Sequence, residues 1–198
     1  MSELELLTVA TRNGHKTQEI AEMLKERFVV RDLSGIAEAP EIEETGKTFA
    51  ENAALKAVGI SRVLPGMVLA DDSGLEVDVL GGAPGVHSAR YAGVQGDDAA
   101  NNKKLIEALK GRPEAERRGR FRCVLVLARE GEVLAEFSGA VEGHLLEKPR
   151  GMVGFGYDPL FVPKGFAETF AELGPEVKNQ LSHRARALDG LVQWLEGR

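Results

Sequence analysis

Two short segments in the last quarter of the chain carry the side chains best suited to binding a nucleobase. Phe155-Gly156-Tyr157-Asp158-Pro159 places an aromatic ring and a carboxylate beside glycines, and Ser182-His183-Arg184 adds a guanidinium, with Lys178 between the two. An open aromatic face can stack on a base, which is worth roughly 1 to 3 kcal/mol. An acceptor at Asp158 and a donor fork at Arg184 match the edge of a purine. We interpret these segments as a purine pocket.

The start of the predicted C-terminal helix supports this interpretation. His183, Arg184 and Arg186 lie in its first turn, where cations oppose the helix dipole at a cost of roughly 0.3 to 1 kcal/mol each. Some acceptor should offset that cost. A purine O6 facing Arg184 is one candidate, with N1-H donating to Asp158 or to a backbone carbonyl, and salt bridges to the acidic surface are the alternative. Tyr157 and Phe161 suit the core better than the pocket.

Acidic side chains at the end of a short apolar run indicate a metal site. Asp71-Asp72-Ser73-Gly74 follows the run 67–70, and Glu41, Glu43 and Glu44 lie in an upstream loop. Carboxylates suit Mg²⁺, which is commonly bound by one or two of them together with substrate phosphates and waters. Adjacent acids repel each other unless a cation or donors offset the repulsion, which favours a functional Asp72. For the glutamates, of which Glu43 and Glu44 are the candidate ligands, a solvated acidic loop is an equal alternative.

A polar loop near the N-terminus could hold an anion. Thr11-Arg12-Asn13-Gly14-His15-Lys16 follows an apolar run and opens a helix, where unpaired N–H groups and the helix dipole favour negative charge. Lys16 would add a full positive charge. The loop does not have the Walker A pattern, and by itself it also fits a plain surface turn.

A second glycine-rich stretch, 81–91, is better explained as a structural turn than as a phosphate cradle. Its glycines lack the dinucleotide-binding spacing, and it does not lie between a strand and a helix. His87 in this stretch is most simply a polar residue with an ordinary partner.

The elements that position these residues alternate between strand and helix. Apolar runs predict strands at 4–10, 28–33 and 67–70, and helical spacing or capping predicts helices after Lys16, from Thr48 and over 98–110. Alternation in 121–128 and a second β-rich run over 133–141 predict an antiparallel hairpin around Glu130-Gly131. The last helix begins near Ser182. The expected fold is α/β, with a mixed sheet flanked by helices.

Composition narrows the class of protein. The 198 residues suit one domain, 1–198, divided into two lobes. A net charge of -6 argues against binding to nucleic-acid backbones, which requires a basic face. The single cysteine, Cys123, excludes an intrachain disulfide framework, and there is neither a leader pattern nor a run of about 18 apolar residues. We expect a cytoplasmic protein that has no contact with membranes.

Taken in order, these motifs resemble the inosine triphosphate pyrophosphatase family, in its bacterial branch acting on dITP and XTP. The resemblance covers nearly the whole chain. It is carried by Thr11-x-Asn13-x-x-Lys16, Glu43-Glu44-Thr45-Gly46, Phe49-x-Glu51-Asn52-Ala53-x-x-Lys56-Ala57, Ala70-Asp71-Asp72-Ser73-Gly74-Leu75, Leu80-Gly81-Gly82-Ala83-Pro84-Gly85, Ser88-Ala89-Arg90-Tyr91, Gly154-Phe155-Gly156-Tyr157-Asp158-Pro159 and Ser182-His183-Arg184. Arg12, where the family often has Gly, and Gly14-His15 depart from its pattern.

The resemblance implies an elongated homodimer of α/β subunits, each with a cleft between two lobes. It also implies Mg²⁺-dependent hydrolysis of ITP, dITP and XTP to the monophosphate and pyrophosphate. Carried over to this chain, the loop of Thr11, Arg12, Asn13, Gly14, His15 and Lys16 would hold the phosphates together with Lys56. Asp72 would ligate the metal and accept a proton from water, and Ser73 would touch the substrate. Phe155, Gly156, Tyr157, Asp158, Lys178, His183 and Arg184 would enclose and read the base.

Other functions fit parts of the pattern. A related pyrophosphatase could act on modified pyrimidine or ordinary triphosphates, and base preference distinguishes it. A nucleotide sensor would bind without releasing pyrophosphate, which Asp72 and its neighbouring glutamates argue against. A purely structural module would leave the cationic helix start unexplained. Guanine shares O6 and N1-H with hypoxanthine, and no residue in the sequence identifies itself as the group that excludes the 2-amino substituent.

Overall fold

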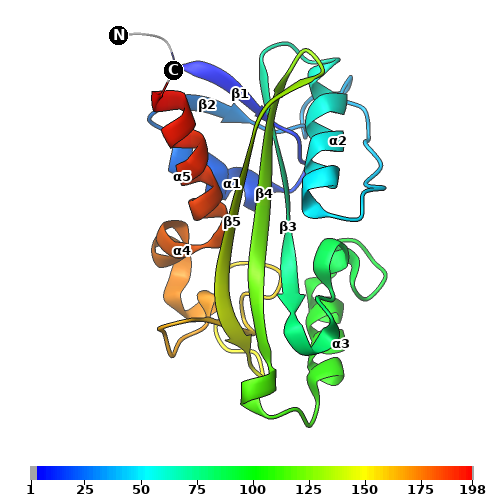
Figure 1. Ribbon diagram of the computed structural model, residues 1–198, viewed down its shortest axis with the longest axis vertical. Coiled ribbons are helices and arrows are strands. Elements are labelled where there is room, and N and C mark those ends of the chain that lie inside the picture. The colour runs from blue at the N-terminus through cyan, green and yellow to red at the C-terminus, as the bar shows by residue number, and fades with distance from the viewer. Residues whose placement is uncertain (1–3, 198) are drawn as a thin grey trace. The chain divides into compact units, whose positions relative to one another are not determined.

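The computed structural model describes residues 4–197 and contains one mixed sheet (Figure 1). Its six strands are ordered β2-β1-β3-β4-β5-β6. β1 (Glu5–Val9) pairs in parallel with both β2 (Phe28–Arg31) and β3 (Met67–Val77). β4 (Arg118–Arg129) and β5 (Glu132–Leu145) are neighbours joined by two residues, which requires an antiparallel hairpin. β6 (Phe161–Pro163) pairs antiparallel with β5, so the predicted mixed sheet is confirmed.

The chain divides into two compact units, of which the first holds residues 1–72, 123–138 and 187–198. It contains α1 (Gly14–Leu24), α2 (Phe49–Ser61) and most of α5 (His183–Glu196). In this unit α1 and α5 lie on one side of the strands and α2 lies on the other (Figure 1). One core cluster joins the strands to α1 and α5, through buried residues Leu7, Val9, Ile20, Leu24, Phe28, Met67, Leu69, Cys123, Leu125, Leu127, Ala187, Leu188 and Leu191.

The second unit holds residues 73–122 and 139–186. It contains α3 (Asp98–Leu109), α4 (Phe170–Leu181) and short 3-10 helices at Asp78–Leu80, Gly85–Arg90 and Glu114–Glu116. Its core is richer in aromatic rings than that of the first unit, with Phe121 only 4.7 Å from Phe161 between ring centroids. The buried members are Leu75, Val77, Leu105, Leu109, Phe121, Val141, Leu145, Tyr157, Leu160, Phe161 and Phe170.

Local signals define the helix starts. Thr48 and Glu51 form the predicted capping box of α2, and the apolar face of that helix, Phe49, Ala53, Ala57 and Ile60, is buried. β4 differs from its simple alternation, because Val124, Val126 and Ala128 are buried as well as Cys123 and Leu125. A strand covered by helices on both faces is apolar on both faces.

β3 corrects the prediction of a short strand ending at Ala70. The strand continues through Asp71, Asp72, Ser73 and Gly74 to Val77, so the acids lie within it and not in a loop after it. Gly74 permits this, because a Cβ there would collide with the Ser88 side chain and the Gly85 carbonyl. Ser88 Oγ also accepts a hydrogen bond from Leu75 N at 2.9 Å, which fixes the far half of the strand.

One helix, α4, has no counterpart in the predicted elements. Thr169 and Glu172 form a second capping box at its start, while Gly174, at φ 78°, and Pro175 kink it. The Gly-Pro pair hides the helix from a periodicity argument, since both residues disfavour helix interiors.

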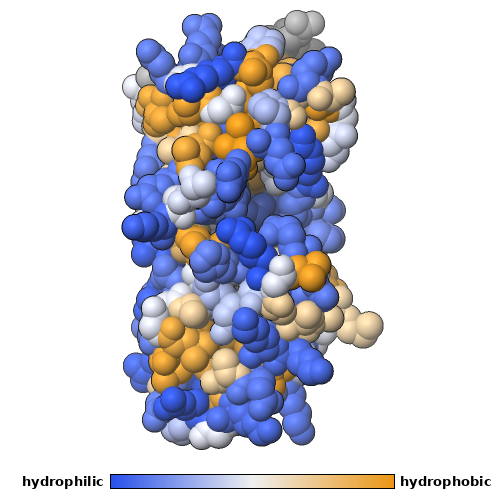
Figure 2. All heavy atoms as spheres, turned by 90° about the vertical axis from the view of Figure 1, so that its right-hand side faces the viewer, coloured by the Kyte–Doolittle hydropathy of each residue, from blue (hydrophilic) through white to orange (hydrophobic). Residues whose placement is uncertain are grey.

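The surface is mixed, and no helix among residues 4–197 is long and apolar enough to span a membrane. Figure 2 turns the right-hand side of Figure 1 to the viewer, and there hydrophobic side chains form separate patches among hydrophilic ones.

Candidate active site

The loop at the start of α1 is organised by Asn13. Its side-chain oxygen accepts from the backbone N–H groups of His15 and Lys16, at 3.0 and 3.3 Å, and its own N–H donates to Thr11 Oγ1. These two N–H groups at the helix end are therefore already hydrogen-bonded. An anion at this loop would depend mainly on Lys16 and on the exposed loop side chains, with less help from the helix end than the sequence suggested.

Lys16 pairs with the buried carboxylate of Asp71. Its Nζ lies 2.5 Å from Asp71 Oδ1, and the side chains are 16% and 0% exposed. On the other side, Cys123 Sγ donates to Asp71 Oδ2 at 3.2 Å. From the sequence, Asp71 was considered only together with Asp72, as one of two acids at a possible metal site. Its contacts give it a role of its own, because they fix the direction of the Lys16 ammonium.

Lys56 gathers the carboxylates that were predicted to hold a metal. Its Nζ donates to Glu44 Oε1 at 2.7 Å and to the Asp71 carbonyl at 2.8 Å, and it lies 3.6 Å from Asp72 Oδ1. Glu44 and Asp72 thus face one ammonium, whereas the Glu43 side chain is exposed. Of the glutamates considered, Glu44 is the one placed at the same cation as Asp72.

Asp72 lies in an environment that raises the pKa of its carboxyl. Burial raises the pKa of its carboxyl above the ordinary value; the charges of Lys56 and Lys16 oppose that rise, and Glu44 adds to it. Burial also acts to lower the pKa of Lys56, but the negative charges of Asp72 and Glu44 outweigh it and raise that pKa. A buried carboxylate with a raised pKa, beside cations, is a candidate proton acceptor.

The carboxylate oxygens of Asp72 and Glu44 are suited to binding a hard cation. Asp72 Oδ2 is buried and has no partner at hydrogen-bonding geometry within the described part of the chain, which is costly for a carboxylate oxygen, although the nearby Asn52 amide acts to lower the pKa of this carboxyl. No group of three or more His, Cys, Asp or Glu side chains with metal-binding geometry occurs among residues 4–197. Two carboxylates with one uncompensated oxygen suit an ion that takes its remaining ligands from phosphates and water, as Mg²⁺ does.

In the second unit, Asp158 organises the loop that carries Phe155. Asp158 Oδ2 accepts from Lys178 Nζ at 2.6 Å and from the Phe155 N–H at 3.0 Å. Lys178 Nζ lies 4.4 Å from the centroid of the Phe155 ring, close enough for a cation–π contact. Because Asp158 is only 2% exposed and accepts these two bonds, its carboxylate holds the loop and Lys178 in place.

Arg184 is brought to Ser73 from a distant part of the sequence. Its Nη2 donates to Ser73 Oγ at 3.0 Å, and its Cζ lies 6.0 Å from the Phe155 ring centroid. Arg184 is 1% exposed, and it is the largest of the fully buried side chains. The adjacent His183 stacks on Phe121, with ring centroids 4.9 Å apart and planes at 14°. His183 and Arg184, which begin α5, therefore each contact a side chain of the second unit.

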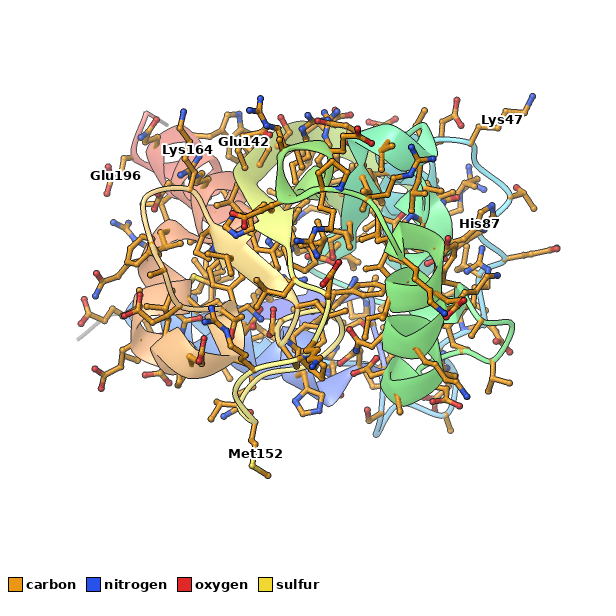
Figure 3. The ribbon with its side chains drawn as sticks, turned by 90° about the horizontal axis from the view of Figure 1, so that it is seen from below. Lys47, His87, Glu142, Met152, Lys164 and Glu196 are labelled. Carbon is orange, nitrogen blue, oxygen red and sulfur yellow. The ribbon has the colours of Figure 1, made fainter. Side chains whose placement is uncertain are left out.

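Other predicted residues have different surroundings. Tyr157 belongs to the core and donates its hydroxyl to the Ser88 carbonyl at 2.9 Å. Arg12 extends to the Ala39 carbonyl at 2.9 Å, and Gly14 and His15 are exposed. His87 is exposed at the periphery (Figure 3). Met152, just before the Phe155 loop, is 99% exposed and points away from the molecule in the same view.

The chain is similar in sequence to a known protein family and to several of its members. Residues 7–194 match the sequence profile of the Ham1 family. The chain belongs to the Ham1 family. It is 49% identical over 189 residues to the dITP/XTP pyrophosphatase of Bacillus subtilis strain 168, covering 95% of this chain and 96% of that protein. It is 50% identical over 192 residues to the dITP/XTP pyrophosphatase of Geobacillus kaustophilus, covering 96% and 94% of the two chains.

Solved Ham1 structures agree with this assignment. The Ham1 protein of Staphylococcus aureus is 38% identical, with a TM-score of 0.85 over 98% of this chain and 99% of that chain. A HAM1 protein from Coxiella burnetii is also 38% identical, with a TM-score of 0.87 over 98% and 100%. The resemblance drawn from the motifs is confirmed, and the site described above is that of a Ham1 protein.

Proposed function

We propose that this Ham1 protein hydrolyses ITP, dITP and XTP to the monophosphate and pyrophosphate, removing deaminated purines from the nucleotide pool. The names of its relatives support this activity. The observation that carries it furthest is that buried Asp72, whose pKa is raised, lies beside the Lys56 ammonium, while Lys16 pairs with the adjacent Asp71. That combination supplies a proton acceptor and two cations, which are the groups that phosphoanhydride hydrolysis needs.

In this mechanism Asp72, Lys16 and Lys56 act on the triphosphate. Asp72 accepts the proton of the water that attacks the α-phosphorus. Lys16, directed by Asp71, and Lys56, held by Glu44, stabilise the negative charge that moves onto the leaving pyrophosphate. No covalent intermediate is needed, because the products form by direct attack of water.

We further propose Mg²⁺ as the cofactor, held by Asp72 and Glu44. Bound there, it would neutralise phosphate charge and lower the pKa of the attacking water. The uncompensated Asp72 Oδ2 supports this assignment. Glu43, the other glutamate considered, lies exposed, which makes it the weaker candidate.

Phe155 and Arg184 would read the base. Phe155 offers a ring for stacking, and Arg184 offers guanidinium donors for the purine O6 while bonded to Ser73. Adenine presents an amino group where Arg184 requires an acceptor. A site built to hydrogen-bond its substrate can reject such a mismatch by roughly 10⁴-fold or more.

The remaining expectations follow from this activity. We propose that the protein works as a cytoplasmic homodimer on free nucleotides and does not bind nucleic acid, in keeping with its net charge of -6. Light scattering on the purified protein tests the dimer.

The deciding experiment measures pyrophosphate and orthophosphate release from ITP, dITP, XTP, GTP and ATP, with Mg²⁺ and after chelation by EDTA. We expect rapid pyrophosphate release from ITP, dITP and XTP, little from GTP or ATP, and none after chelation. Binding without release would instead identify a nucleotide sensor. Orthophosphate release, or a preference for ordinary or pyrimidine triphosphates, would refute the assigned chemistry or substrate.

A further inference from the structure

The backbone of Gly156 is held on both sides by two side chains of α3. Its N–H donates to Asp98 Oδ2 at 2.6 Å, and its carbonyl accepts from Asn102 Nδ2 at 2.8 Å. Asp98 and Asn102 are four residues apart, so they lie on the same face of the helix. Neither residue was singled out from the sequence, where they look like ordinary polar positions on an exposed helix.

The Phe155 loop needs such support because it has no regular backbone pairing. Gly154 and Gly156 both have positive φ, 91° and 61°, conformations that carry little penalty only for glycine. Gly154 also packs so tightly that a Cβ would collide with the Asp158 carboxylate. Within this loop, the Gly156 peptide groups are fixed by α3, and the Phe155 N–H is fixed by Asp158.

The orientation of Asn102 follows from its partners. Its Nδ2 donates to two carbonyl oxygens, that of Gly156 and that of Asp98, each at 2.8 Å. The opposite orientation of the amide would direct its oxygen at both carbonyls, which cannot donate. Asn102 is therefore a donor in this contact, and an acid of the same shape could not replace it.

We propose that Asp98 and Asn102 are positioning residues for base selection. They hold Gly156, and through it the adjacent Phe155 ring, in the place where the ring meets Lys178 and lies near Arg184. This inference rests on the proposed function, since it assigns the Phe155 loop to the base. It assigns part of the base selectivity to two residues, Asp98 and Asn102, that contact neither the base nor the phosphates.

The helix itself does not depend on this contact. α3 is anchored by Leu105 and Leu109, which are 0% and 1% exposed in the aromatic-rich core. Its N-terminal end is further tied down by Asn101, which bonds the Ala89 carbonyl and the Ala92 N–H. Loss of the Gly156 contacts should therefore loosen the loop and leave α3 in place.

The test compares kcat/KM for dITP and dATP in four variants. Asn102→Asp keeps the shape but loses the donor, and Asp98→Ala loses the acceptor. Each should lower the dITP-to-dATP ratio by roughly five- to tenfold, the effect of one lost hydrogen bond. Asp98→Asn retains a side-chain oxygen that can accept, so it should preserve most of the ratio. Lys103→Ala, an exposed neighbour on the same helix, is the matched control and should leave it unchanged.

Product inhibition separates loop positioning from general damage. In Asn102→Asp and Asp98→Ala, inhibition by dIMP should weaken, while inhibition by pyrophosphate, which has no base, should stay within twofold of the parent value. An unchanged dITP-to-dATP ratio in folded variants would overturn the inference, and so would parallel losses for dIMP and pyrophosphate. If the parent protein does not release pyrophosphate from dITP, the proposed function itself has failed.

Discussion

Lys16 Nζ lies 2.5 Å from Asp71 Oδ1, and the Asp71 side chain is fully buried, so the two residues form a charge pair within the first unit. The neighbouring acid, Asp72, faces Lys56 instead. Successive residues of a strand point to opposite faces, which is how adjacent acids come to serve different lysines. Asp71 fixes the direction of the Lys16 ammonium, whereas Asp72 keeps one carboxylate oxygen, Oδ2, without a hydrogen-bond partner among residues 4–197.

Asp71→Asn should weaken the grip on phosphate. The neutral amide removes the charge that directs Lys16, so we expect kcat/KM for dITP to fall by about tenfold and the free energy of unfolding by about 1 to 3 kcal/mol. Steady-state kinetics and urea denaturation measure both. Glu22→Gln, which breaks the exposed pair with Lys25, is the control and should change neither. Normal kinetics in Asp71→Asn would exclude Asp71 from directing Lys16.

Cys123 should contribute to the same arrangement through its hydrogen bond to Asp71. Cys123→Ala removes the donor, and we expect a two- to fivefold rise in KM, about the value of one weak hydrogen bond. Cys123→Ser keeps a hydroxyl donor at nearly the same position and should stay close to the parent protein. Equal effects of the two substitutions would show that Cys123 acts through packing alone.

Asp72→Asn should abolish turnover and stabilise the fold. Losing the proton acceptor should lower kcat by about 10² to 10⁴-fold. Because burial raises the Asp72 pKa, the folded state binds a proton more tightly than the unfolded chain does. Stability therefore falls as pH rises between the ordinary and the raised pKa. Thermal unfolding should show the Asn variant more stable at neutral pH, with the difference shrinking in acid. A less stable variant at neutral pH would contradict this account.

The pH dependence of kcat/KM should report Asp72. The residue must be ionised to accept a proton, so the acidic limb of the profile should lie above the ordinary pKa of an aspartate. Lys56 favours the ionised form, so Lys56→Gln should move that limb to higher pH, besides lowering the rate. An unshifted limb in Lys56→Gln would mean that another group controls it.

Arg184 should determine the preference for a 6-keto purine. Arg184→Lys keeps the charge but loses the guanidinium fork, and we expect the ITP-to-ATP ratio of kcat/KM to fall by at least about tenfold. Arg186→Ala, two residues further and exposed, serves as the control. Because Arg184 is buried, circular dichroism should first establish that the Lys variant is folded. A folded variant with an unchanged ratio would remove Arg184 from base reading.

The parts of the fold that follow local rules could be predicted from the sequence. The capping box at Thr48 and the hairpin around Glu130-Gly131 depend on neighbouring residues, and both were placed correctly. The extension of β3 beyond Ala70 could not be predicted in the same way. Asp71 and Asp72 have the composition of a loop, and their burial is stabilised by partners distant in sequence, chiefly Lys16, Lys56 and Cys123.

The candidate site shows the same division. Arg184 stood out because a cation in the first turn of a helix opposes the helix dipole, and Lys178 stood out because it lies between the two segments of the predicted base pocket. Asp98 and Asn102 did not stand out, because their partner is the backbone of a glycine more than fifty residues away. No pattern of side chains along the sequence predicts such a contact. The only signal in the sequence was their spacing, because Asn102 follows Asp98 by four residues and both therefore lie on one face of a helix.

The position of Asp71 and Asp72 inside β3 limits how this protein can evolve. A strand tolerates substitutions but not changes of length, because shifting its register by one residue exchanges the faces to which its side chains point. One inserted or deleted residue between Met67 and Asp71 would present each aspartate to the wrong lysine. Homologues should therefore vary in length within their surface loops and keep this segment of constant length.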